Sequence, residues 1–133
     1  MYLDHIAIWT DDLEKLKEFY SGYFNCTVSA RYDNPQKQFS SYFLTFPSGA
    51  GIEIMKRSDI TESDRRETLG LAHIAICVGS EEDVDAITHK LRDAGVKIRS
   101  NPRRTGDGFY ESVVLDPDDN LIELTARRAT KHS

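Results

Sequence analysis

The chain has 133 residues, enough for one compact core or for two small modules that share one. A formal net charge of −5 argues against general nucleic-acid binding, so we expect no nucleic-acid partner. No apolar run approaches membrane-spanning length and no charged-then-apolar leader is present, so we expect no membrane association. Two cysteines do not resemble a disulfide framework, and the cytoplasm is the simplest expected location.

The first half of the chain reads as a strand, a helix and three further strands. A strand is expected at His5–Ile8, and an amphipathic helix follows in which apolar residues recur at three- and four-residue steps from Leu13 to Phe24. Asp11 or Thr10 is the expected N-cap of this helix. Later strands are expected at Thr27–Tyr32, Phe39–Phe46 and Gly51–Lys56.

The second half repeats this order. A strand is expected at His73–Ile76, and a helix begins after Ser80, carries Glu81–Asp83 in its first turn and ends at Gly95. The apolar stripe of this helix consists of Val84, Ile87, Leu91 and Ala94. The remaining strands are expected at Val96–Arg99, Tyr110–Leu115 and Leu121–Ala126.

These two halves indicate an internal duplication. We predict an α+β fold in which tandem βαβββ modules form a cup-shaped mixed β-sheet with the helices on the outside. The modules are expected at about 1–57 and 70–127 and together form a single domain over residues 1–127, with a tail at 128–133. The charged, aperiodic stretch Ile60–Thr68 is the expected linker between them.

Each half also carries the same pair of chemically active residues. His5 begins the first expected strand of its half and Glu53 lies on the last, 48 residues later; His73 and Glu123 repeat the arrangement with a separation of 50. Each Glu has an aliphatic neighbour on both sides. Because side chains alternate along a strand, the His and Glu side chains leave the face opposite to the aliphatic ones.

An ionised Glu is rarely placed among strand aliphatics without a partner, because its desolvation costs several kcal/mol. Two imidazoles and two carboxylates form a nitrogen and oxygen ligand set that suits zinc, nickel, iron, cobalt or manganese. We therefore predict that His5, Glu53, His73 and Glu123 bind one divalent metal ion.

The paired βαβββ pattern, these four residues and the region Val114–Leu124 resemble the vicinal oxygen chelate superfamily, from Met1 to about Ala126. The order His, Glu, His, Glu is most similar to the glyoxalase I branch, lactoylglutathione lyase. The resemblance implies a metal-dependent lyase or isomerase acting on a small α-oxygenated carbonyl compound or its thiol adduct. It implies Glu123 as the catalytic base, Glu53 as its opposed partner, and a homodimer.

The chain departs from the glyoxalase I pattern where that pattern contacts substrate. Trp9 stands where an Arg is common, and Arg57 stands where an Asn is common, so we expect these two residues to bind a substrate other than a glutathione adduct. The loop Gly106–Tyr110 has two glycines and the aromatic residues Phe109 and Tyr110. It is either a lid that contacts the substrate or an ordinary connection between strands.

Two other functions stay open. One is an iron-dependent dioxygenase that uses His5, His73 and one of the carboxylates, which oxygen consumption with ferrous iron would reveal. The other is a binding protein of the bleomycin-resistance type that sequesters a small aromatic or cationic compound, which would form a stoichiometric complex without turnover.

Overall fold

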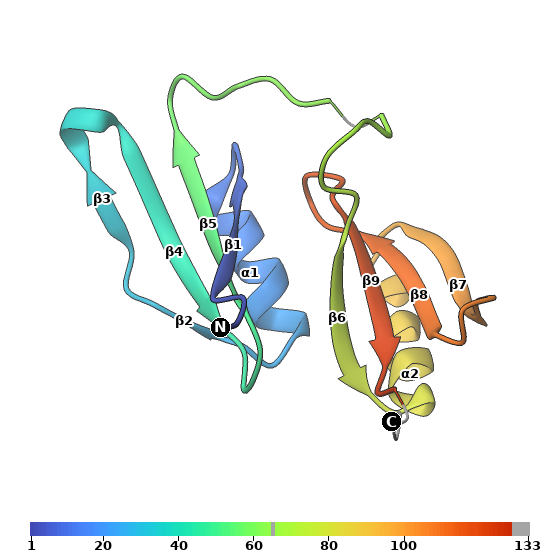
Figure 1. Cartoon of the computed structure of the whole chain (residues 1–133). Coiled ribbons are helices and arrows are strands. Elements are labelled where there is room, and N and C mark those ends of the chain that lie inside the picture. The colour runs from blue at the N-terminus through green and yellow to red at the C-terminus, as the bar shows by residue number, and fades with distance from the viewer. Residues whose placement is uncertain (65, 129–133) are drawn as a thin grey trace. The chain divides into compact units, whose positions relative to one another are not determined.

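The computed structural model describes residues 1–64 and 66–128, and its contacts divide the chain into two compact units after Asp64 (Figure 1). Residue 65 of the expected linker and residues 129–133 of the expected tail lie outside the described residues. In the described part, no helix is both long and apolar enough to cross a membrane. The two units are described separately below.

The N-terminal unit is a sheet with one helix on one of its faces (Figure 1). Strand β1 pairs in parallel with β5, β5 pairs antiparallel with β4, and β2 and β3 both pair along the other edge of β4. The elements are β1 (His5–Trp9), α1 (Leu13–Tyr23), β2 (Thr27–Val28), β3 (Tyr32–Asn34), a 3-10 turn η1 (Pro35–Lys37), β4 (Phe39–Thr45) and β5 (Gly51–Arg57).

The N-cap expected for α1 was wrong by one or two residues. Asp12 caps the helix, because its carboxylate Oδ1 accepts a hydrogen bond from the backbone N–H of Lys15 at 3.1 Å. Thr10 lies two residues before this cap: its hydroxyl accepts from the backbone N–H of Asp12 at 3.2 Å, and its own backbone N–H donates to the carbonyl of Met55 at 2.8 Å, which continues the pairing of β1 with β5.

The strand expected at Thr27–Tyr32 is interrupted. Val28 pairs with Leu44 and Tyr32 pairs with Ser41, so four steps along one strand match three steps along β4. One extra residue on an edge strand is a bulge, which breaks the ladder locally. The prediction of one strand at this place therefore becomes two short strands, β2 and β3.

The C-terminal unit has the strand order β6-β9-β8-β7, with one helix on one face of its sheet (Figure 1). Strands β6 and β9 are parallel, and the other pairs are antiparallel. The bounds predicted for β8 and β9 are confirmed, whereas β7 lies two residues later at its start and five residues later at its end. The elements are β6 (Ile74–Gly79), α2 (Glu81–Asp93), β7 (Ile98–Arg104), β8 (Tyr110–Leu115) and β9 (Leu121–Ala126).

Both ends of α2 follow the sequence prediction. Ser80 and Asp83 form a reciprocal capping box, and Gly95 follows the helix with a φ of 86°. The expected apolar stripe is only partly right: Ala94 is exposed, while Thr88 is buried. Thr88 is accommodated there because its hydroxyl bonds to the carbonyl of Val84 at 2.6 Å and to the hydroxyl of Ser112 at 2.7 Å.

Each helix buries the aliphatic face of its own sheet. The fully buried side chains include Leu16, Leu44 and Ile54 in the N-terminal unit, and Leu91, Ile122 and Leu124 in the C-terminal unit. The predicted α+β fold with tandem βαβββ modules is confirmed. Because each helix covers one face, the groups that alternate with the aliphatic residues leave the opposite surface, which we call the helix-free face of each sheet.

Candidate metal and substrate site

Both units place their His and Glu by the same strand register. In the N-terminal unit Ala7 of β1 lies opposite Glu53 of β5, so His5 lies two residues before the partner of Glu53. In the C-terminal unit Ala75 of β6 lies opposite Glu123 of β9, so His73 holds the equivalent position. Residues two apart on a strand share a face, and each His therefore leaves the helix-free face together with its Glu.

In the C-terminal unit this register brings the two side chains into contact. His73 Nε2 lies 3.1 Å from Glu123 Oε1. The turn before β9 fixes Glu123, because the Asp116 carboxylate accepts backbone N–H bonds from Asp118 and Asn120, both at 2.9 Å. A nitrogen and a carboxylate oxygen at this separation are placed to bind the same ion.

The histidine of the N-terminal unit has a different partner. His5 Nδ1 lies 2.7 Å from the carboxylate of Asp4, and the edge of its ring contacts Phe43 at a centroid distance of 5.2 Å. A carboxylate on one ring nitrogen orients an imidazole whose other nitrogen binds a metal, as is usual for metal-ligating histidines. Asp4 is thus a supporting residue that the sequence analysis missed, although it directly precedes His5.

Each unit supplies two of the four expected ligands. Within residues 1–64 and 66–128, no group of three or more His, Cys, Asp and Glu is arranged to hold a metal ion. The donor types and the shared faces fit a divalent ion, and the convergence of all four ligands stays a prediction.

A third charged group of the C-terminal site was also missed. Glu111 on β8 is only 7% exposed and lies on the helix-free face, where burial and the neighbouring Glu123 carboxylate raise the pKa of Glu111. Arg103 partly offsets this, because its guanidinium lies 3.7 Å from the Glu111 carboxylate and donates to the Glu111 carbonyl at 3.0 Å. Strand alternation could have predicted this position, because Glu111 and Val113 lie on one face of β8 and Val113 lies opposite Glu123.

The expected substrate residues of the N-terminal unit lie together. Trp9 on β1 and Arg57 on β5 both leave the helix-free face, and the Arg57 guanidinium lies over the Trp9 ring, 5.0 Å from its centroid. These two residues therefore share the face that carries His5 and Glu53.

The two aromatic residues of the 106–110 loop are placed differently. The Tyr110 hydroxyl donates to Asp85 of α2 at 2.6 Å, so Tyr110 lies on the helix-covered side of the sheet, away from Glu123. Phe109 lies at the end of a tight turn in which the Thr105 backbone N–H donates to its carbonyl at 2.8 Å, and its ring contacts Arg128. The structure does not bring Tyr110 to the expected site, because strand alternation directs it to the other face.

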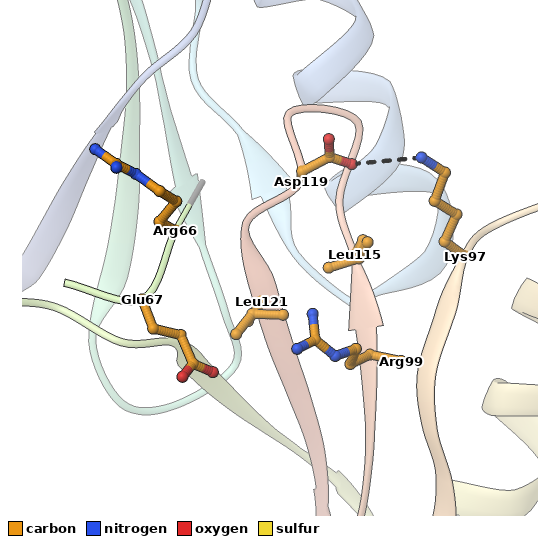
Figure 2. A pocket seen from close by; sticks show the side chains of 7 residues that line it. All are labelled: Arg66, Glu67, Lys97, Arg99, Leu115, Asp119 and Leu121. Carbon is orange, nitrogen blue, oxygen red and sulfur yellow. Dashed lines mark ion pairs between the residues drawn. The ribbon is translucent and has the colours of Figure 1, made fainter. Parts of the chain in front are cut away.

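The C-terminal unit has a hollow of about 380 Å³ on the helix-free face of its sheet (Figure 2). Leu115 and Leu121 lie opposite each other on β8 and β9, and Leu121 is two residues before Glu123 on the same face. Figure 2 shows Lys97 directed toward Asp119, 4.0 Å away, at the rim. The full lining consists of Arg66, Glu67, Lys97, Arg99, Leu115, Asp119 and Leu121. Five of the seven lining side chains are charged, and Glu123 is not among them.

The family assignment follows from comparison with known proteins. The Glyoxalase/Bleomycin resistance protein/Dioxygenase superfamily model matches residues 2–124, and the chain belongs to this superfamily. A probable lactoylglutathione lyase of Synechocystis sp. is 27% identical over 133 residues, which cover 98% of this chain and 99% of that protein. The lactoylglutathione lyase GLX1 of Arabidopsis thaliana is 27% identical over 128 residues, which cover 95% of this chain and only 44% of the plant protein.

Solved structures agree with this assignment. The trypanothione-dependent glyoxalase I of Leishmania major superposes with a TM-score of 0.75 at 25% identity, covering 95% of this chain and 86% of that one. The fosfomycin resistance protein FosX of Listeria monocytogenes, solved with Mn(II), gives a TM-score of 0.71 at 25% identity and covers 95% of this chain and 92% of that one. The similar structures thus include a glyoxalase I and a fosfomycin resistance protein, the second of which was solved with a divalent metal.

Proposed function

We propose that this chain is a metal-dependent lyase or isomerase of the glyoxalase I type, acting on a small α-oxygenated carbonyl compound or its thiol adduct. The observation that carries the proposal is the repeated His and Glu register, with His73 and Glu123 in contact at 3.1 Å. The similarity to lactoylglutathione lyases over nearly the whole chain supports the same conclusion.

We propose His5, Glu53, His73 and Glu123 as the ligands of one zinc, nickel, iron, cobalt or manganese ion. A divalent ion there would polarise a carbonyl oxygen and stabilise the negative charge that develops when a proton leaves the adjacent carbon. The two modules would supply two ligands each, within one chain or across the two chains of a homodimer.

The chain's own carboxylates would move the proton. Glu123 is the proposed base, and His73 Nε2, 3.1 Å away, would bind the same ion. Glu123 would hold the proton that it removes and return it to the neighbouring carbon, and Glu53 is its opposed partner beside the ion.

We also propose that the protein is a homodimer. Large apolar side chains are exposed at the N-terminus and just before β6, among them Leu3, Leu69 and Leu71, and two-fold pairing is the commonest way to cover such surface. Sedimentation velocity at micromolar concentration should give a dimer mass. A strictly monomeric species would contradict the dimer and leave the fold unaffected.

The proposed activity is tested by metal analysis followed by turnover assays. Protein purified without chelator should contain about one divalent ion per site and should isomerise hemithioacetals formed from several thiols, with loss of activity after chelation and recovery on adding metal. His73→Gln should lower both metal content and turnover, whereas His89→Gln, on the exposed side of α2, should change neither. Oxygen consumption with ferrous iron, or a stoichiometric complex without turnover, would replace this function with one of the two alternatives.

A further inference from the structure

The helix-free face of the first sheet carries an aromatic surface at the end away from His5. Trp9 is the last residue of β1, and Phe39 at the start of β4 lies opposite Arg57 at the end of β5. A strand rises about 3.3 Å per residue, so Trp9 lies about 13 Å along β1 from His5. Arg57 lies four residues beyond Glu53 on β5, and Glu53 lies opposite Ala7, two residues before Trp9. The pair Trp9 and Arg57 therefore lies further along the same face than the pair His5 and Glu53.

Direct contacts join these side chains into one surface. The Trp9 and Phe39 rings meet edge to face at a centroid distance of 6.2 Å, and Phe39 meets Tyr32 of β3 in the same way at 6.0 Å. The Arg57 guanidinium lies 5.0 Å from the Trp9 centroid. Three rings and one cation thus form a continuous row across β3, β4, β5 and β1.

This row is held in place yet remains open. Trp9 is 37% exposed and Tyr32 is 54% exposed, although burial of such rings is strongly favourable. The Arg57 Nε donates to the carboxylate of Asp59 at 2.5 Å, which fixes the plane of the guanidinium. This bond does not involve the two terminal nitrogens of Arg57. A guanidinium that is already oriented can bind a carboxylate through two parallel hydrogen bonds with little loss of side-chain entropy.

We propose that Trp9, Phe39 and Arg57 form a subsite that binds a planar aromatic group bearing a carboxylate. The rings meet edge to face and provide apolar surface against which an aromatic group can pack, and Arg57, over the Trp9 ring, provides the matching charge. The inference rests on the proposed function in one respect: it assigns this group to the distal part of the substrate, beyond the carbonyl that would react near His5 and Glu53. The substrate class is then an α-oxygenated carbonyl compound, or its thiol adduct, with an aromatic acid at its far end.

Trp9 is the only tryptophan of the chain, so intrinsic fluorescence reports on this subsite alone. We would titrate the full metal-free chain with benzoate, with benzamide, which lacks the charge, and with cyclohexanecarboxylate, which lacks the aromatic plane. Benzoate should quench Trp9 saturably. Benzamide should bind at least tenfold more weakly, since a hydrogen bond to a charged group contributes one to two decades in affinity. Cyclohexanecarboxylate should also bind more weakly, because it keeps the charge but lacks the aromatic ring that packs against Trp9 and Phe39.

Matched variants assign the effect to Arg57. Arg57→Gln should weaken benzoate binding at least tenfold. Lys56→Gln removes the same charge from the neighbouring position of β5, whose exposed side chain leaves the other face, and it should bind benzoate as the wild type does. Equal binding of benzoate and benzamide, or equal loss in both variants, would overturn the subsite.

These measurements need neither metal nor turnover, so the two proposals can fail separately. Benzoate binding that depends on Arg57, in a protein that turns over no carbonyl compound, would keep the subsite and remove the enzyme function. Turnover of a carbonyl compound without such binding would keep the enzyme function and remove the subsite. A blue shift of Trp9 emission that rises with protein concentration, together with no response to benzoate, would show that a second copy covers this face and would overturn the subsite.

Discussion

The helix-free faces of the two sheets carry the same His and Glu pair in different surroundings. On the first sheet, His5 and Glu53 share their face with the aromatic row and Arg57. On the second sheet, His73 and Glu123 are in contact, and they share their face with the buried carboxylate of Glu111 and its partner Arg103. One face is mainly aromatic and the other is mainly charged.

This difference shows which part of a duplicated module is fixed and which part is free to diverge. The register of the parallel strands places Ala7 opposite Glu53 and Ala75 opposite Glu123, so the His and Glu pair follows from backbone pairing alone. Neighbouring strands supply the remaining side chains of each face. Under the proposed function this gives a division of labour in which the first sheet binds the far end of the substrate and the second supplies the base, Glu123.

The largest expected effect tests whether the two units depend equally on their helices. Leu16 of α1 and Leu91 of α2 are both fully buried, and Leu16→Ala and Leu91→Ala should each lower the free energy of unfolding by about 2 to 5 kcal/mol. Urea denaturation followed by circular dichroism measures both, with the exposed Glu18→Ala as a control expected within about 0.5 kcal/mol of wild type. A loss below about 1 kcal/mol in one variant alone would show that the two units are not equivalent.

The next effect concerns the two carboxylates. Glu123→Gln should preserve the fold and lower turnover about a hundredfold or more, because a proton-transfer group typically contributes that much. Steady-state kinetics at matched metal content would compare it with Glu53→Gln. If Glu123→Gln retains near-wild-type turnover while Glu53→Gln loses it, the base lies on the aromatic face, and the division of labour stated above is wrong.

A smaller effect is expected in the choice of thiol. Trp9 and Arg57 replace the polar pattern that resembling enzymes use for the glutathione carboxylate, and the loss of one charge-assisted contact costs roughly 1.5 to 3 kcal/mol, about one to two decades in affinity. The glutathione adduct of methylglyoxal should therefore give a kcat/KM at least tenfold below that of an adduct with an aromatic acid at its far end. A glutathione adduct turned over with the higher efficiency would contradict this.

The smallest effect concerns the loss of stability of the N-terminal unit at acid pH. The Tyr42 hydroxyl, followed by Lys17 and Arg31, lowers the pKa of Glu14 from its ordinary 4.5 to about 2. Because the folded pKa is the lower one, the stability that this carboxylate provides is complete above about pH 4.5 and is lost as the pH falls toward about 2. Glu14→Gln should therefore destabilise the protein at pH 6 and approach wild type near pH 2.5 in urea unfolding. The exposed Glu18→Gln should show no such trend, and a difference that is independent of pH would exclude the linkage.

Much of the fold could be predicted because it depends on local chemistry. Alternation predicted the faces of β1, β5 and β9, and the Ser80 cap and Gly95 predicted both ends of α2. The same alternation placed His5 with Glu53 and His73 with Glu123, since the geometry of a strand alone decides which side chains share a face.

Tertiary pairing decided the rest. Asp12 rather than Thr10 caps α1, because Thr10 still continues the pairing of β1 with β5 and the helix begins only at Leu13. The strand after α1 is split, because β4 has one residue fewer along their shared edge. Tyr110 bonds to Asp85 of α2, and Glu111 gains Glu123 and Arg103 as neighbours from other strands. The sequence by itself determined the repeated modules and their His and Glu pairs, since these rest on short-range periodicity. Only the tertiary structure decided which side chains surround each pair, because those neighbours come from strands that are distant along the chain.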